Sequence, residues 1–266
     1  MSSSRVPTQL APDRGRAAWL FTAAVLLGLA GFAGFVLPQL QSEQRAEALV
    51  REELLYSRKG IPSESEKAVA LFERALLEKP GYPPARAALA ETTARFSNGP
   101  ARAAIAMARE ALESDPDCDE CMATLGYILM TPEWAWEESE ALLQKAIKWN
   151  PGDLHRQLWY AQWLSVQGRL AEAQQHAEQA IRLDSTRPDG RALLAGIHYF
   201  AGRHPQAIQE AQTAIAMNRT HYQAYLWLER SYMMAGRDLD VIGARGAGTA
   251  AWFAWNLPME RECCLR

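Results

Sequence analysis

The stretch that decides the fold is Gly168-Arg169-Leu170-Ala171-Glu172-Ala173, which returns one period later as Gly202-Arg203-His204-Pro205-Gln206-Ala207. In both copies small residues follow at i, i+4 and i+7: Ala173, Ala177 and Ala180, then Ala207, Ala211 and Ala214. This spacing puts three minimal side chains on one helix face, against which a second helix can pack closely. A period of about 34 residues predicts helix–turn–helix units stacked into a solenoid.

The same period extends in both directions along the chain. The position that closes each unit is Pro80, Pro116, Pro151, Ser185 and Arg219, and the successive steps are 36, 35, 34 and 34. The corresponding helix-face residues in the first three units are Ala68, Phe72 and Ala75, then Ala104, Ala108 and Ala111, then Ser139, Leu143 and Ala146. A sixth first helix is expected from Tyr222 to Ala235. The sequence therefore predicts an all-α, right-handed solenoid of five repeats and a partial sixth.

These features resemble the tetratricopeptide (TPR) repeat family, from about Ala46 to Asp240. The resemblance implies helix pairs whose first helices line a concave groove that binds a protein partner. Carried over repeat by repeat, the groove positions are Glu120, Ala123, Tyr127 and Met130, then His155, Leu158, Gln162 and Ser165, then Asp189, Ala192, Gly196 and Tyr199, then Gln223, Leu226, Arg230 and Met233. Aromatic, methionine and small residues with a few polar ones suit an extended or helical protein ligand. The lysine and asparagine clamp with which some family members hold a C-terminal carboxylate is not matched.

An uncharged segment, residues 17–37, precedes the repeats. It is long enough to cross about 30 Å of hydrocarbon. Three arginines and one aspartate lie in residues 1–16, so the positive-inside rule puts that end in the cytoplasm. A signal peptide cleaved after Gly31-Phe32-Ala33 is the alternative, although the apolar run continues past that point to Leu37. We expect a single-pass protein of the inner (cytoplasmic) membrane, with its repeats outside the cytoplasm.

The expected order of segments follows from these assignments. It is a short cytoplasmic N-terminus (1–16), a transmembrane helix (17–37), a linker (38–47), the solenoid (48–240) and an irregular apolar tail (241–266). The tail is expected to be irregular because its first residues are rich in glycine, a poor helix former. Its apolar cluster, Trp252 to Trp255, also lacks the polar character that the end of a solenoid usually has.

The four cysteines form two pairs, Cys118/Cys121 and Cys263/Cys264, which are too few for a disulfide scaffold. The first pair opens a helix, where the pKa of a thiol is lowered, so a thiol oxidoreductase is one hypothesis. No βαβ pattern surrounds this pair, however, and Met122 stands where a haem-attachment motif has histidine. A zinc site would need a second ligand pair at suitable spacing. A possible local disulfide between Cys118 and Cys121, or two ordinary thiols, is the interpretation that we prefer.

The rest of the sequence offers no further chemistry. A net charge of -3 gives no basic face for nucleic acid. The five histidines are spread over three repeats, and there is no phosphate-binding glycine loop, nucleophile elbow or HExxH motif. We therefore expect no catalytic residues, metal, cofactor, nucleic acid or small-molecule substrate. The expected partners are a protein in the concave groove and the membrane through residues 17–37.

Three stretches are similar to the TPR segments of one bacterial group. They are Lys67 to Leu76, Leu125-Gly126-Tyr127 followed by Trp134 and Trp136, and Trp159-Tyr160-Ala161 leading to Gly168-Arg169. That group consists of transmembrane regulators with an N-terminal winged-helix DNA-binding domain, for which the short segment 1–16 leaves no room. The resemblance implies an extracytoplasmic sensor of a transcription-regulatory system, whose DNA-binding part is separate or missing. Single-span TPR proteins that assist envelope assembly share the same layout, and a non-enzymatic interaction scaffold of this kind is the function that we predict.

The predicted topology can be tested with a reporter fusion. Alkaline phosphatase is active only outside the cytoplasm, so a fusion after Asp240 should be active. The mobility of this fusion on a gel would show whether cleavage occurs at Ala33. A fusion after Asp240 that stays inactive in cells would reverse the assignment.

Overall fold

The computed structural model describes residues 38–50, 65–96, 101–130 and 135–256. The chain divides into two compact units, residues 1–45 and 46–266. Residues 38–50 are helical, where a linker over 38–47 was expected. The predicted membrane span at 17–37 lies outside the described residues, and no helix within them has the length and apolar character needed to cross a membrane.

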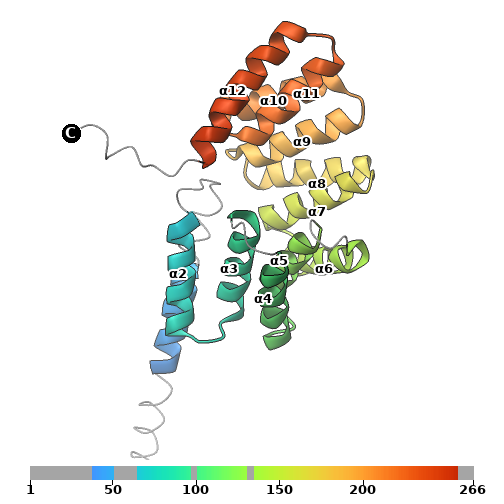
Figure 1. The fold of residues 1–266 in the computed structure, drawn as a ribbon. Coiled ribbons are helices and arrows are strands. Elements are labelled where there is room, and N and C mark those ends of the chain that lie inside the picture. The colour runs from blue at the N-terminus through green and yellow to red at the C-terminus, as the bar shows by residue number, and fades with distance from the viewer. Residues whose placement is uncertain (1–37, 51–64, 97–100, 131–134, 257–266) are drawn as a thin grey trace, which may run out of the picture. The chain divides into compact units, whose positions relative to one another are not determined.

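From residue 65 onward the described residues form helices joined by turns, with no strand (Figure 1). The first helices of the repeats are α3 (Pro83–Phe96), α5 (Asp119–Leu129), α7 (Leu154–Val166), α9 (Pro188–Phe200) and α11 (Tyr222–Met234). The second helices are α2 (Ser65–Glu78), α4 (Ala101–Ser114), α6 (Trp136–Trp149), α8 (Leu170–Leu183), α10 (His204–Met217) and α12 (Asp238–Asn256). Each second helix from α4 to α12 packs on the first helix before it, which confirms the predicted all-helical solenoid.

The small-residue stripe of the second helices forms the core. Every predicted helix-face residue, from Ala68 in α2 to Ala214 in α10, is at most 1% exposed. The first helices also carry small residues where they face this stripe. At Gly126 of α5, an ideal Cβ would lie only 2.9 Å from Cγ of Leu143 in α6, so the leucine occupies the space that the glycine leaves. The Ser139 hydroxyl donates a hydrogen bond to the Gly126 carbonyl (2.7 Å), which holds the two backbones together.

Glycines close three of the predicted turns between first and second helices. Gly168, Gly202 and Gly236 have φ of 75°, 71° and 68°, in the left-handed region where a side chain is strained. The arginine after each glycine donates its backbone N–H to a carbonyl of the preceding helix, as Arg203 does to His198 (2.8 Å). This is the Schellman arrangement, which satisfies carbonyls that the end of the helix would otherwise leave without partners.

The main difference from the sequence prediction lies in residues 241–256, which were expected to be irregular. They belong to α12, a helix of 19 residues. Val241, Ala244, Gly248 and Ala251 are buried at i, i+3, i+7 and i+10, one face of the helix. An ideal Cβ at Gly248 would lie 3.0 Å from Cβ of Tyr225, so glycine allows α12 to lie close against α11. Packing here outweighs the low helix propensity of glycine, which costs about 1 kcal/mol per residue relative to alanine.

The close approach of the helices predicts a position-specific effect on α10. Ala207 is fully buried, whereas Gln209 on the same helix is exposed. Ala207→Leu should lower the free energy of unfolding by about 1–3 kcal/mol, because the added carbons overfill a packed interface. Gln209→Leu introduces the same side chain and should stay within about 0.5 kcal/mol of the parent. Urea unfolding followed by circular dichroism measures both, and equal effects would contradict the assigned packing.

Candidate functional site

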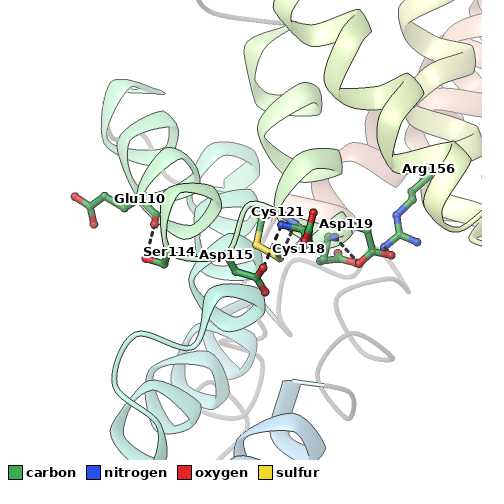
Figure 2. The surroundings of a disulfide bond; sticks show 9 residues. Glu110, Ser114, Asp115, Cys118, Asp119, Cys121 and Arg156 are labelled. Atoms are coloured by element: carbon green, nitrogen blue, oxygen red, sulfur yellow. Dashed lines mark hydrogen bonds and ion pairs between the residues drawn. A yellow bond between two sulfur atoms is a disulfide. The ribbon is translucent and has the colours of Figure 1, made fainter.

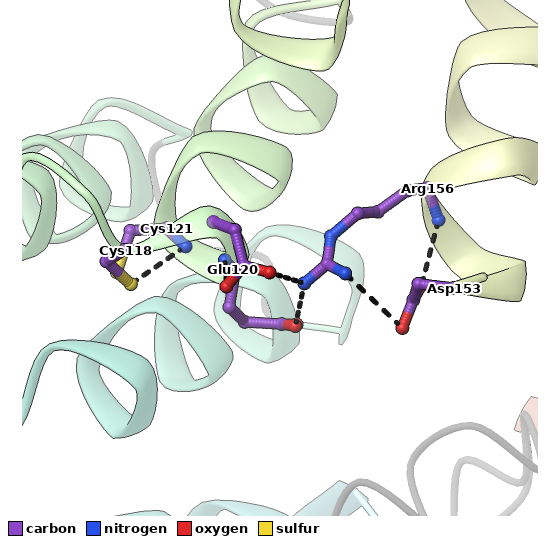
Figure 3. A network of polar contacts seen from close by, with 6 residues as sticks. Cys118, Glu120, Cys121, Asp153 and Arg156 are labelled. Carbon is purple, nitrogen blue, oxygen red and sulfur yellow. Dashed lines mark hydrogen bonds and ion pairs between the residues drawn. A yellow bond between two sulfur atoms is a disulfide. The ribbon is translucent and has the colours of Figure 1, made fainter. Parts of the chain in front are cut away.

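A buried arginine links the N-terminal ends of α5 and α7. Arg156 is 3% exposed, and its Nη2 lies 3.2 Å from Asp119 and 3.2 Å from Glu120, both in the first turn of α5 (Figure 3). Its Nη1 lies 3.8 Å from Asp153, which caps α7 by accepting the Arg156 backbone N–H (3.1 Å). Acidic side chains at helix N-termini are stabilised by the helix dipole, and here they also surround one guanidinium. Glu120, a predicted groove residue, is thus engaged in contacts within the fold.

A second polar group lies at the corresponding ends of α9 and α11. Arg187 contacts Asp189 (Nη2 to Oδ2, 2.9 Å) and reaches His155 of α7 (3.5 Å). His221 lies 3.7 Å from the other oxygen of Asp189. Burial alone would raise the pKa of the Asp189 carboxyl, but His221 and the charge of Arg187 outweigh it and hold that pKa well below its usual range. Asp189 and His155, both predicted groove residues, therefore belong to one polar network.

Cys118 and Cys121 are joined by a disulfide at the start of α5, with their Cα atoms 5.2 Å apart (Figure 2). The two residues are 6% and 0% exposed and pack against Ala87 of α3 and Ala111 of α4. Cys118 also caps the helix, since its sulfur accepts the Cys121 backbone N–H (3.1 Å). Thiol exchange requires access to a sulfur atom. The burial of this pair favours a structural bond over a redox-active one.

In the third and fourth repeats, three predicted groove positions are part of the interior, and Ala123 is the most fully buried of them at 0% exposed. Met130 and Leu158 are 4% and 8% exposed, so neither is free to contact a partner as expected. Met130 packs in the core cluster that contains Trp159 and Trp163 of α7. Tyr127 is half-buried and stacks on Trp159, with 4.9 Å between ring centroids. Aromatic residues of α7 therefore fill the part of the groove beside Tyr127 and Met130 from within.

The fifth and sixth repeats present an open surface instead. Tyr199 of α9 lies against Trp227 of α11 (5.7 Å between centroids), and Phe200 meets the same indole edge-on (5.3 Å). The Arg230 guanidinium lies over Trp227, 5.3 Å from the ring centroid. Phe200 is 54% exposed, and Met233 on α11 is also 54% exposed. We call these five residues the aromatic–arginine surface.

The sequence prediction found only part of this surface. Tyr199, Arg230 and Met233 were predicted, but Phe200 and Trp227 were not. A repeat-spaced signal existed for both of them. Val166, Phe200 and Met234 stand at the same position of successive repeats and are all more than half exposed. Trp227 follows Trp159 by two periods of the repeat.

The other predicted groove residues do not join one site. Gln162 is half-buried and Gln223 is exposed. Leu226 lines a cleft of about 340 Å³ between α11 and α12, with Tyr222, Tyr225, Glu229, Arg245, Gly248 and Thr249. One repeat earlier, the positions of Leu226 and Glu229 are occupied by Ala192 and Ala195, which lie buried beneath α11. In the last repeat this position of α11 carries Glu229, which forms an ion pair with Arg245 of α12 (2.7 Å). A polar pair here suits the end of a solenoid, which needs a polar cap.

Metal-binding and catalytic groups were not expected. Within the described ranges, no three histidine, cysteine, aspartate or glutamate side chains converge as metal ligands would. The carboxylates at the helix N-termini are engaged in contacts with Arg156 and Arg187, and no nucleophile with an adjacent base was identified in the sequence. The arrangement is suited to contact with another molecule through its aromatic–arginine surface.

Comparison with known proteins agrees with the fold. Residues 135–197 and 164–226 match the family model of the tetratricopeptide repeat. No curated protein sequence matches the chain at a significant level. Residues 135–226 thus carry tetratricopeptide repeats, and the helix pairs form a solenoid of the TPR type.

Three solved structures illustrate the similarity. The first is TTC0263, a thermophilic TPR protein of Thermus thermophilus, with 20% identity and a TM-score of 0.56 over 71% of this chain and 99% of that one. The second is PilW, a type IV pilus biogenesis factor, with 19% identity and a TM-score of 0.59 over 79% and 94% of the two chains. The third is human IFIT1 with PPP-AAAA, with 19% identity and a TM-score of 0.61 over 71% of this chain and 46% of that one. At these identities the similarity concerns the fold alone.

The buried arginine generates a stability prediction. Arg156→Gln removes the cation shared by Asp119, Glu120 and Asp153, so three carboxylates face one another without it. We expect a loss of about 3 kcal/mol in the free energy of unfolding, the lower end for a broken buried pair, because the carboxylates partly reach water. Arg182→Gln is the control, since that side chain is 62% exposed and should contribute less than about 1 kcal/mol. Comparable losses from both variants in urea unfolding would refute this assignment.

Proposed function

We propose that this protein is a membrane-anchored, non-enzymatic scaffold whose TPR solenoid binds a protein partner on its concave face. The observation that supports this proposal most directly is the aromatic–arginine surface on α9 and α11. It combines a half-exposed phenylalanine and methionine with an indole and a guanidinium. Aromatic and arginine side chains dominate the binding energy of protein interfaces. TPR proteins are typically scaffolds of this kind.

The membrane part of the proposal rests on the sequence alone. The uncharged run at 17–37 and the arginines before it favour an anchor with the repeats outside the cytoplasm. PilW, which has a similar fold, is described as a pilus biogenesis factor. A role in assembling a structure of the cell envelope would suit an anchored scaffold.

A sensor in a transcription-regulatory system is the second candidate. It is favoured by the resemblance of Lys67 to Leu76 and of the tryptophan-containing third repeat to the TPR segments of transmembrane regulators. The two candidates differ in the partner that they require. An envelope protein bound to the repeats supports the scaffold, whereas dependence of a regulon on a separate winged-helix protein supports the sensor.

The partner can be identified by crosslinking the full chain in its native membrane and isolating the product. Tyr199→Ala should then weaken binding of the purified partner by about 2 kcal/mol or more, about thirtyfold in Kd, as loss of an aromatic anchor does. Gln209→Ala, on the second helix α10, should leave the Kd unchanged. Circular dichroism melting of both variants separates lost contacts from lost folding. Normal binding by Tyr199→Ala together with lost binding by Gln209→Ala would place the interface on the opposite face.

A further inference from the structure

The aromatic–arginine surface depends on a glycine in the preceding repeat. Gly196 lies in α9, and an ideal Cβ at this position would be 2.8 to 3.0 Å from three atoms of the Trp227 indole. Real side chains essentially never come so close, so only glycine lets the indole lie directly on α9. Repeat by repeat, this position is occupied by Tyr127, Gln162, Gly196 and Arg230. The missing side chain at Gly196 therefore fixes the position of the Trp227 indole against α9.

The seated indole carries a cation on its face. The Arg230 centroid distance of 5.3 Å lies within the range of a cation–π contact. A guanidinium carries its five N–H donors in one plane, and a cation–π contact uses its charge and not an acceptor for these donors. Arg230 is exposed, so these donors can reach another molecule.

Arg230 differs in its charge balance from three other arginines of the last two repeats. Arg191 pairs with Glu210 (2.8 Å), Arg237 with Asp240 (2.7 Å) and Arg245 with Glu229 (2.7 Å). Among the residues that the structure describes, no carboxylate lies within ion-pair distance of Arg230. Its positive charge is therefore not neutralised inside the solenoid and is available to a partner.

We propose that the aromatic–arginine surface binds a peptide segment in which an aspartate or glutamate stands next to an aromatic or aliphatic residue. The side-chain carboxylate accepts two hydrogen bonds from the planar fork of Arg230, a geometry that lysine cannot reproduce. The neighbouring apolar side chain packs on Phe200 and Met233, which are both half-exposed. This inference rests on the proposed function and specifies the chemistry of the partner.

Charge favours a peptide over the other anionic polymers. Nucleic acid is bound through several lysines and arginines that follow the phosphate backbone. Here one uncompensated guanidinium stands among apolar side chains, and the whole chain has a net charge of -3. A single carboxylate beside an apolar residue complements this surface more closely than a row of phosphates does.

The test is a selection of 12-residue peptides, displayed on phage without a free C-terminus, on the immobilised full chain. The selected peptides should be enriched in aspartate or glutamate adjacent to an apolar residue. Selection on Arg230→Gln should lose the acidic enrichment and retain the apolar one. Arg182→Gln is the matched control, because it removes the same charge from α8, where the side chain is 62% exposed. It should select the same peptides as the parent chain.

The best selected peptide is then synthesised with an amidated C-terminus, together with a version in which glutamine replaces the acidic residue. Arg230→Gln should raise the Kd of the acidic peptide about tenfold, because a charge-assisted, bidentate contact is lost. It should leave the Kd of the glutamine version unchanged. Arg230→Lys should recover only part of the affinity. Equal weakening of both peptides, or the same loss in Arg182→Gln, would overturn the proposal.

Two further probes test the other classes of partner. The first probe is a dT12 oligonucleotide, and the second is vesicles of equal parts phosphatidylglycerol and phosphatidylcholine. If either one binds more tightly than the peptide and requires Arg230, the peptide proposal is overturned in favour of nucleic acid or membrane. The proposed function is tested separately. If Tyr199→Ala weakens binding of the crosslinked partner but Arg230→Gln does not, the scaffold function is supported and the proposed acidic segment is wrong. If neither variant affects the partner, the groove itself is wrong.

Discussion

Everything else in this solenoid depends on how closely each second helix approaches the first helix before it. Fully buried alanines at i, i+4 and i+7 bring the helix axes together, and a glycine or alanine on the facing helix completes the contact. Close-packed interiors tolerate few changes in volume. Because this spacing repeats, each pair presents the same surfaces to the next, and the contacts along the chain are those between neighbouring units.

Such a contact has a cost, because alanines bury little apolar area and area is what stabilises a core. The first helices supply the missing volume through large side chains such as Trp159, Trp163 and Ile197. Where Trp159 stacks on Tyr127, these two aromatic side chains fill the groove and pack against the core. In α9 the equivalent of Trp159 is Leu193, and Trp227 of α11 packs on Gly196 of α9 while it remains partly exposed.

The sequence predicted the fold well, because a regular repeat with small residues in register admits few other structures. It failed at α12, where the packing of one buried face, including Gly248 against Tyr225, makes a helix of a glycine-rich segment. The groove positions were predicted less well, since helical spacing tells which residues share a face but not how deeply a neighbour covers that face. Met130 and Leu158 share that face with Tyr199, yet both are buried, and Met130 packs in the core cluster that contains the tryptophans of α7. Phe200 and Trp227 were missed because they stand one position away from those that the repeat family uses.

The two ends of the first helices therefore have different roles. At the N-terminal ends Arg156, Arg187 and Asp189 are held by partners from neighbouring repeats, so these charges bind the repeats to one another. A partner that approached there would have to break contacts already made. Toward the C-terminal ends Arg230 and Phe200 remain open to solvent, and a partner would gain contacts without removing any. Specificity is therefore expected at the end where the solenoid has left its charge uncompensated.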